Sequence, residues 1–393
     1  MIPSYFEFYN PVKIMAGKNA LDNLPFELMQ LQAKKPLVIT DQGILKAGIL
    51  KSVKKAFSET DITFSLFDRV PQDSSDKIVK ELANIYRETK SDSLIALGGG
   101  SVIDTAKAVN ILITHESDNL LDFVGSDIIN LPLKPLIIIP TTSGTGSEAT
   151  GVAVIKNSIN NIKMGFSSQH IIPDVALLDP RMTLTLPPLL TAATGMDALT
   201  HAMESSYCSQ RNPVTTAFAF SAIKMISEHL VQVIKQPKDS DARFALSTAA
   251  FLAGVRLSNS LAGMVHSLGH ATGGVCGLPH GIAMNIFLPH GLKYNLAKAG
   301  DLIGELLLPL AGSEFFTQVP KVDRPVATIK YIESLRDNLY DLVNLPRSLK
   351  EANVPKSEFE TIAQYAINDG SIAFNPEEVD YEDALHVLNE AYN

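Results

Sequence analysis

The stretch SLIALGGGSVID, residues 93–104, decides the fold of the N-terminal part of the chain. Its first five residues, Ser93–Leu97, form a short, mostly apolar run that ends abruptly in three glycines, which is typical of a buried strand. Ser101 is a good N-cap and Asp104 three residues later completes a capping-box pattern, so we expect a helix to begin there. A strand that turns at once into a helix is typical of a parallel sheet covered by helices.

Other segments repeat this alternation of strand and helix. Pro36–Thr40 and Leu136–Ile139 are short β-branched runs followed by polar residues or proline, and both are predicted to be buried strands. Apolar residues recur at helical spacing over Asp76–Tyr86, between the first two strands. We therefore predict a Rossmann-like α/β domain over residues 1–185.

The composition changes near residues 180–188. Beyond Pro187 and Pro188, long segments that contain alanine and methionine continue almost without β-branched clusters, and we interpret them as helices. Four examples are Leu189–Ser206, Pro213–Leu230, Asp241–Leu257 and Ala262–Gly274. We therefore predict that residues 186–393 form a separate all-helical domain. The expected fold class is an α/β domain followed by an all-α domain.

Composition and charge exclude several classes of protein. The 393 residues carry 33 basic and 42 acidic side chains, a net charge of −9 with no basic run, which argues against DNA or RNA as a partner. Two cysteines, Cys208 and Cys276, cannot build a disulfide framework and indicate a reducing compartment. Neither an export signal nor an uninterrupted apolar run of about eighteen residues is evident, so we expect a cytoplasmic protein without a membrane partner.

The three glycines of the opening stretch are a candidate phosphate-binding loop. Gly98, Gly99 and Gly100 let the backbone turn tightly and approach a ligand, and free N–H groups at the start of the next helix suit a pyrophosphate. We expect Ser101 and Asp104 to belong to this nucleotide site. An ordinary glycine turn between strand and helix is the alternative, because the pattern is neither the G-x-G-x-x-G fingerprint nor a P-loop.

A second loop follows the third predicted strand. The run PTTSGTGSE at residues 140–148 holds five hydroxyl side chains, more than a turn needs. Thr141, Thr142 and Thr145 can donate hydrogen bonds to phosphate or ribose oxygens at the strand ends, where doubly wound sheets bind ligands. A turn that hydrogen-bonds its own backbone is the alternative. Asp41 also follows a strand; it could bind a ribose 2′-hydroxyl and favour NAD over NADP, or simply terminate the strand as a polar residue.

The strongest chemical signal is a group of histidines in the helical half. Four of the nine histidines fall within 25 residues, namely His266, His270, His280 and His290. Upstream, Asp197 and His201 are four residues apart, so on a helix with a pitch of about 5.4 Å both side chains lie on one face. A carboxylate with several imidazoles is a ligand set for Fe²⁺ or Zn²⁺ rather than Ca²⁺ or Mg²⁺. Structural pairing of the carboxylate and imidazole, and satisfied core histidines, are the alternatives.

Together these motifs resemble the iron-containing (group III) alcohol dehydrogenases over essentially the whole chain. The resemblance is carried by four segments in order, at residues 98–104, 140–148, 193–201 and 266–281. It implies a dehydroquinate synthase-like fold, with a nucleotide-binding α/β domain and a metal-binding catalytic domain. Relatives commonly dimerise through N-terminal strands, here about residues 6–15, so a homodimer or higher homo-oligomer is expected.

The resemblance also implies roles for individual residues. One catalytic metal, most simply Fe²⁺ with Zn²⁺ as the alternative, would be bound by Asp197, His201, His266 and His280. His270 resembles the family residue close to metal, nicotinamide and substrate, and is the candidate catalytic residue. The glycine loop, the threonine loop and Lys163 resemble contacts to the cofactor, and Asp41 resembles the carboxylate that favours NAD. One departure is Asp73, where many relatives have asparagine.

The activity that the resemblance implies is metal-dependent, NAD-linked and reversible hydride transfer between a small primary alcohol or diol and NAD. His270 would relay a proton or orient the substrate. A propane-1,3-diol or glycerol dehydrogenase is the nearest alternative. Two alternatives belong to other classes: a metal-dependent lyase or cyclase of the dehydroquinate synthase type, and a non-catalytic protein that binds metal or nucleotide. The particular alcohol does not follow from the sequence, because one methylene changes binding by only about 1–3 kcal/mol.

Overall fold

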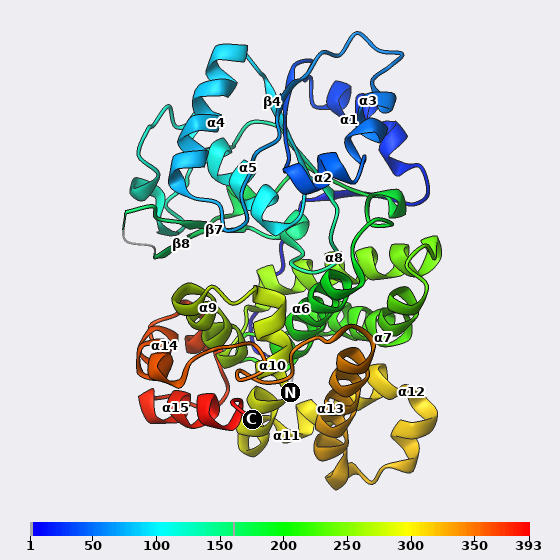
Figure 1. The fold of residues 1–393 in the computed structure, drawn as a ribbon, viewed down its shortest axis with the longest axis vertical. Helices are drawn as coiled ribbons and strands as arrows, with labels where there is room; N and C mark the ends of the chain where they lie inside the picture. Colours follow the sequence, from blue (N-terminus) through cyan, green and yellow to red (C-terminus); the bar gives the residue numbers. More distant parts are fainter. Residues whose placement is uncertain (1–2, 160–161) are drawn as a thin grey trace. The chain divides into compact units, whose positions relative to one another are not determined.

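The computed structural model describes residues 3–159 and 162–393. The chain divides into two compact units (Figure 1): an α/β unit, Asn10–Leu186, and a helical unit, Pro187–Asn393, to which the N-terminal segment ending at Tyr9 also belongs. The Tyr9 N–H donates a hydrogen bond of 2.7 Å to Asn259 Oδ1 of the helical unit. Local composition carries no signal for this placement, because the two partners are 250 residues apart along the chain.

A six-stranded sheet organises the α/β unit. Its strands lie in the order β1-β9-β6-β4-β2-β3, and every neighbouring pair is parallel. The three strands predicted from the sequence are β2, β4 and β6, which lie side by side in the sheet and are buried along their whole length. The bounds are β1 Lys13–Ala16, β2 Pro36–Ile39, β3 Ser65–Phe67, β4 Ser93–Gly98, β6 Leu136–Pro140 and β9 Val175–Leu178.

Helices cover both faces of this sheet. Ile95 and Leu97 of β4 belong to one hydrophobic cluster, with side chains of α1 and α3, whereas Leu94 and Ala96 belong to another, with α4 and α5. Successive side chains of a strand point to opposite faces, so a strand without polar positions has to be buried on both. The helices are α1 Leu24–Gln30, α2 Gln42–Lys46, α3 Leu50–Ala56, α4 Asp76–Thr89 and α5 Gly100–Thr114.

The direction in which strands are added to the sheet reverses between β2 and β4. From β2 the chain adds β3 on one side, and from β4 it adds β6 and then β9 on the other. The carboxyl ends of strands at such a reversal form the crevice where doubly wound sheets bind ligands. Thr40, just beyond β2, donates a hydrogen bond of 2.7 Å from Oγ1 to the Leu97 carbonyl of β4 and ties the two strand ends together.

A second, three-stranded sheet was not predicted. It has the order β5-β8-β7, with bounds β5 Gly125–Ser126, β7 Val152–Lys156 and β8 Lys163–Ser167. The fully buried Lys107 of α5 attaches this sheet to the unit: its Nζ donates to the Thr150 carbonyl at 2.7 Å, to Thr150 Oγ1 at 3.1 Å and to the Val152 carbonyl at 2.9 Å. These bonds use all three donors of the ammonium group.

Ten α-helices lie between Pro187 and Asn393, and the first four match the predicted helical segments within a few residues. One hydrophobic cluster gathers around α6, α7, α8 and α13, and another around α9, α14 and α15. Helix α10 joins the two, with Leu288 and Leu292 in the first cluster and Met284 and Phe287 in the second. The bounds are α6 Pro188–Tyr207, α7 Pro213–Lys235, α8 Ser240–Ser260, α9 Met264–Cys276, α10 His280–Tyr294, α11 Leu296–Glu305, α12 Leu307–Gln318, α13 Arg324–Val343, α14 Phe359–Ala366 and α15 Tyr381–Glu390.

Among the described residues, one helix is long and apolar enough to cross a membrane by length and composition alone, namely α7. No such segment was expected from the uninterrupted apolar runs. Core helices pass the same test, and Ile223, Ile226 and Leu230 of α7 are fully buried in the first cluster of the helical unit. A single helix of this kind is weak evidence for a membrane span.

Candidate metal centre and nucleotide loops

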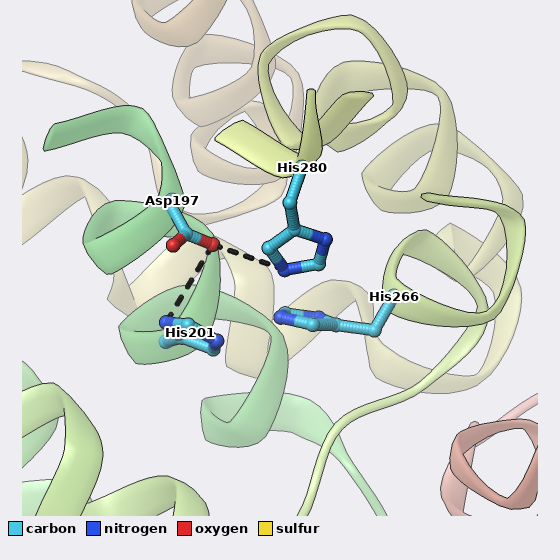
Figure 2. A group of neighbouring side chains, drawn as sticks. All are labelled: Asp197, His201, His266 and His280. Atoms are coloured by element: carbon cyan, nitrogen blue, oxygen red, sulfur yellow. Dashed lines mark ion pairs between the residues drawn. The ribbon is translucent and has the colours of Figure 1, made fainter. Parts of the chain in front are cut away.

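Three helices of the helical unit bring the predicted metal ligands together. Asp197 and His201 lie one turn apart on α6, His266 is in the first turn of α9, and His280 is the first residue of α10. One possible ligand atom from each side chain lies within 4.8 Å of the others. Figure 2 shows the carboxylate between two imidazoles and the third ring beside them.

Several of these possible ligand atoms are buried and lack a hydrogen-bond partner among the described residues. Asp197 Oδ1, His201 Nδ1 and His266 Nε2 are inaccessible to water and have no hydrogen-bond partner within residues 3–159 and 162–393. The dashed lines of Figure 2 join Asp197 Oδ1 to His201 Nδ1, 3.8 Å away, and to His280 Nε2, 3.3 Å away. Buried polar atoms without partners are costly. One carboxylate oxygen and three imidazole nitrogens that converge in this way fit a divalent cation such as Fe²⁺ or Zn²⁺.

The surroundings hold three of the four possible ligands in protonation states that suit a metal. Burial alone would raise the pKa of Asp197, but the adjacent imidazoles of His201 and His280 outweigh burial and hold its pKa well below the usual range. Burial lowers the pKa of His201 to about 3, and it also lowers the pKa of His280. A carboxylate and neutral imidazoles bind a cation without first releasing protons.

Glu204 supports the cluster and was missed in the sequence. His266 Nδ1 forms a short hydrogen bond with Glu204 Oε2, and Glu204 Oε1 accepts a hydrogen bond of 2.7 Å from the Val265 N–H. Burial lowers the pKa of His266, but the hydrogen bond to Glu204 outweighs burial and raises it. A signal was available: Asp197, His201 and Glu204 follow one another at spacings of four and three, which places them on one face of a helix.

His270 lies beside the cluster. Its ring stacks on that of His280, with centroids 5.2 Å apart, and its Nδ1 is 2.9 Å from Asp369 Oδ2. Burial raises the pKa of Asp369, but the hydrogen bond to His270 outweighs it and brings the pKa well below the usual range. Asp369 was missed, because it follows the histidine by 99 residues. His290 is not part of the cluster; its Nδ1 lies 3.9 Å from Glu390.

Close backbone packing fixes the start of α10. Pro279 is the N-cap, so the helix begins at His280. A Cβ atom on the next residue, Gly281, would overlap the backbone carbonyl of Ala193 on α6. Only glycine therefore lets α10 approach α6 closely enough to bring His280 to Asp197.

In the α/β unit the two predicted cofactor loops lie against each other. A Cβ atom on Gly99 would lie 3.1 Å from Thr142 Cγ2, and one on Gly100 would lie 2.8 Å from Thr145 Cγ2. The Thr141 N–H donates a hydrogen bond of 3.0 Å to the carbonyl of Gly98, because β4 and β6 are neighbours that end in register. The loops thus form one surface at the carboxyl edge of the sheet, next to the strand reversal.

The predicted capping box is wrong. The helix begins at Gly100 with Gly99 as its N-cap, and no side chain caps it. Gly100 is already helical, so Ser101 and Asp104 lie inside the first turns rather than at the cap. Asp104 Oδ2 instead accepts a hydrogen bond of 3.0 Å from the Val154 N–H of β7.

The two remaining predicted cofactor residues also have partners within the protein. Asp41 is the N-cap of α2, and its Oδ1 accepts a hydrogen bond of 3.0 Å from the Ile44 N–H. Lys163, at the start of β8, forms an ion pair of 3.5 Å with Asp73, the residue that departs from the family pattern. Asp73 has a φ of 52°, in the left-handed region that asparagine and aspartate tolerate better than most residues.

Two buried charged residues, Lys107 on α5 and Glu148 at the end of the threonine loop, were missed in the sequence. Burial lowers the pKa of Lys107 to about 8 and raises the pKa of Glu148 to about 7. The two groups influence each other's pKa, and Asp104 also acts on that of Lys107. Glu148 is almost fully buried in the short 3₁₀ helix Ser147–Ala149 that ends the threonine loop.

Comparisons with known proteins give consistent results along the whole chain. Residues 11–180 match the family model described as iron-containing alcohol dehydrogenase, and residues 191–392 match the C-terminal model of the Fe-containing alcohol dehydrogenase family. Alcohol dehydrogenase 4 of Saccharomyces cerevisiae is 34% identical over 387 residues, which cover 98% of each chain. An NAD-dependent methanol dehydrogenase of Bacillus methanolicus is 32% identical over 391 residues, which cover 98% of this chain and 99% of that one.

Solved structures agree. The crystal structure of a 1,3-propanediol oxidoreductase is 30% identical, with a TM-score of 0.94, and the match covers 99% of this chain and 100% of that one. The comparisons confirm the predicted resemblance and the predicted fold, a parallel α/β domain followed by an all-helical domain.

Proposed function

This chain belongs to the iron-containing alcohol dehydrogenase family of oxidoreductases, and on that premise we propose that it oxidises a small primary alcohol or diol with NAD⁺ and catalyses the reverse reduction. The observation that carries the proposal is the convergence of four ligand atoms, three of them buried without a hydrogen-bond partner among the described residues. Relatives with this fold are named for different substrates, including methanol and 1,3-propanediol, so the chemistry is shared while the alcohol varies.

Asp197, His201, His266 and His280 would hold one divalent ion, Fe²⁺ or Zn²⁺. When bound, such an ion is a Lewis acid that acidifies an alcohol hydroxyl and polarises an aldehyde carbonyl. The chain's own contribution is to supply one negative charge, from Asp197, in a cluster that water reaches only beside the half-buried His280.

His270 is the proposed residue for proton movement. Asp369 occupies its Nδ1, so Nε2 remains to accept or donate a proton or to orient the substrate hydroxyl. In the overall reaction the alcohol carbon loses a hydride to the nicotinamide ring, and the hydroxyl proton leaves for solvent. His270 would accept that proton and pass it on to solvent.

The loops at the sheet edge would bind the dinucleotide. The backbone N–H groups that open α5 suit its pyrophosphate, and Thr141, Thr142 and Thr145 supply hydroxyl donors; Lys163 adds a positive charge. Asp41 supports NAD over NADP, because a carboxylate beside the ribose repels a 2′-phosphate. One of its oxygens caps α2, and the other is available to a ribose hydroxyl.

A 1,3-propanediol dehydrogenase is a specific second candidate, favoured by the TM-score of 0.94 to the 1,3-propanediol oxidoreductase. Both candidates predict NADH formation, so a panel of ethanol, butanol, 1,2-propanediol, 1,3-propanediol and glycerol separates them by relative kcat/KM.

The decisive experiment follows NADH absorbance with metal-free protein, with protein reloaded anaerobically with Fe²⁺ or Zn²⁺, and with the His266→Ala variant. We expect turnover only in the reloaded wild-type protein, with the variant folded by circular dichroism. Turnover of the metal-free protein would refute the proposal, as would consumption of a substrate without net NADH, which is the behaviour of a lyase.

We also propose a homodimer in the cytoplasm. Strand β1 is an edge strand of the main sheet, with one side free of strand partners among the described residues, and could pair with a second copy. Both cysteines are free thiols, which suits a reducing compartment. Light scattering coupled to size exclusion tests the assembly, and a monomer would refute it.

A further inference from the structure

Glu204 is not one of the four proposed metal ligands, but its side chain contacts one of them, His266. Its side chain is fully buried on α6, and its Oε2 is hydrogen-bonded to His266 Nδ1. A carboxylate only accepts hydrogen bonds, so Nδ1 carries a proton, and in the neutral ring that binds a metal Nε2 presents its lone pair. That Nε2 is the buried atom that has no hydrogen-bond partner in the described part of the chain, and the ring of His266 points into the cluster in Figure 2. The hydrogen bond thus selects the tautomer that a metal requires.

The second oxygen of Glu204 holds the helix that carries His266. The N-cap of α9, Gly263, makes no side-chain cap of its own. Glu204 Oε1 takes over that role from α6, because it accepts the Val265 N–H at 2.7 Å in the first turn of α9. A negative charge at a helix N-terminus is also favourable toward the helix dipole. One side chain therefore fixes both the orientation of the ring and the position of its helix.

We propose that Glu204 is a positioning residue of the metal centre, which raises the affinity for the divalent ion by fixing the tautomer and orientation of His266. The inference rests on the proposed function, because it takes the four-residue cluster as the metal site. Partners of this kind, one hydrogen bond away from a ligand, typically change metal affinity by about 10–100-fold.

The test measures the dissociation constant for Zn²⁺ by competition with a chromophoric chelator, using the full chain prepared without metal. We expect Glu204→Gln to bind Zn²⁺ about 10–100-fold more weakly than the wild type. A glutamine side chain has one acceptor oxygen and one NH₂ donor group, so it can accept a hydrogen bond from only one of the two groups that Glu204 holds, His266 Nδ1–H and the Val265 N–H. With Co²⁺ as a spectroscopic probe, the visible absorption bands of the variant should shift, since the geometry of the His266 ligand changes.

Two control variants separate positioning from stability. Asn375 Oδ1 accepts the Met264 N–H at 3.2 Å, so Asn375→Ala removes another bond at the same end of α9 without touching His266. Glu228→Gln changes an exposed carboxylate on α7. We expect Asn375→Ala to lower the Tm while binding Zn²⁺ like the wild type, and Glu228→Gln to change neither.

The outcomes are distinct. Zn²⁺ binding by Glu204→Gln equal to the wild type would overturn the inference, as would an equal loss in Asn375→Ala, which would assign the effect to helix capping. If Glu204→Gln does not fold, Glu204→Asp keeps the charge but is too short to reach both partners; weaker Zn²⁺ binding supports the inference, and unchanged binding overturns it. A wild-type protein that binds no Zn²⁺, Fe²⁺ or Co²⁺ would refute the metal site itself.

Discussion

In the helical unit, ligand atoms of Asp197, His201 and His266 are buried with no hydrogen-bond partner inside residues 3–159 and 162–393. In the α/β unit, by contrast, the carboxylates of the candidate nucleotide site serve the protein itself: Asp41 caps α2, and Asp104 accepts a bond from β7. Beside the proposed threonine hydroxyls, the loops offer a ligand backbone N–H groups on a surface whose shape the glycines set. Side-chain charge should therefore decide binding at the metal centre, and the space that the glycines leave should be critical at the nucleotide loops.

The largest effect is expected from Asp197→Asn, which keeps the volume of the side chain and removes the only negative charge among the four ligands. Metal content by mass spectrometry should fall below a tenth of the wild-type value. Alcohol oxidation should slow by about 10³-fold or more, which corresponds to about 4 kcal/mol of transition-state stabilisation. NAD binding by calorimetry should stay within twofold. If Asp197→Asn keeps the metal content and the alcohol oxidation rate of the wild type, the proposed difference between the metal centre and the nucleotide loops is wrong.

The corresponding experiment in the α/β unit is Gly100→Ala. The added methyl group would lie 2.8 Å from Thr145 Cγ2 and force the two loops apart. Overpacking of this kind costs about 1–3 kcal/mol, so NAD affinity should fall roughly 5- to 160-fold while metal content is retained. Gly165→Ala on β8 is the matched control, because nothing lies within 4 Å of its Cβ position. Equal NAD affinity in both variants would contradict the role of the loops.

A smaller effect is expected from Asp369→Asn, which leaves all four metal ligands in place. The neutral amide holds His270 less firmly, and kcat should fall about tenfold, less than the 10²–10⁴-fold that complete loss of an acid–base group typically costs. KM for the alcohol and metal content should change little. The exposed Asp341→Asn serves as control. A change in metal content without a change in kcat would place Asp369 in the metal site instead.

The last prediction concerns the stability of the α/β unit rather than binding or turnover. Burial raises the pKa of Glu148 to about 7, so between its unfolded value near 4.5 and pH 7 the folded state binds more protons than the unfolded state. Stability from this group is complete below the unfolded pKa and is lost as the pH rises through the folded pKa. Glu148→Gln should remove that loss and gain at most about 3 kcal/mol at pH 8 relative to pH 4.5. Urea unfolding of metal-free protein at both pH values measures it; an identical pH dependence in both proteins would contradict the assignment.

Much of the architecture could be predicted because it depends on local sequence patterns. Runs such as Leu136–Ile139 are apolar at every position, and only a strand buried on both faces needs that. The i, i+4 spacing of Asp197 and His201 depends on the geometry of one helix, so it was visible without any tertiary information. The prediction that His266 and His280 complete the ligand set relied on the histidine cluster in the sequence and on the family resemblance.

Other features depend on contacts between distant segments and left no local trace. Asp369 pairs with a histidine 99 residues away, and Lys107 reaches across to β7 from the middle of an apolar helix. The capping box failed for a related reason: a Ser-x-x-Asp pattern predicts a helix start only where the backbone before it is not already helical, and here the helix begins one residue before Ser101. The proposed domain limits at residues 185 and 186 and the individual cofactor contacts stay predictions.

The contact between Gly281 and the carbonyl of Ala193 has a consequence for engineering. It sets the spacing of two ligand-bearing helices by main-chain atoms, so any side chain larger than that of glycine at position 281 would force the two helices apart. Altering the radius of the ion that the protein accepts would therefore demand a different offset between α6 and α10. Directed evolution toward new alcohols should therefore leave Gly281 unchanged.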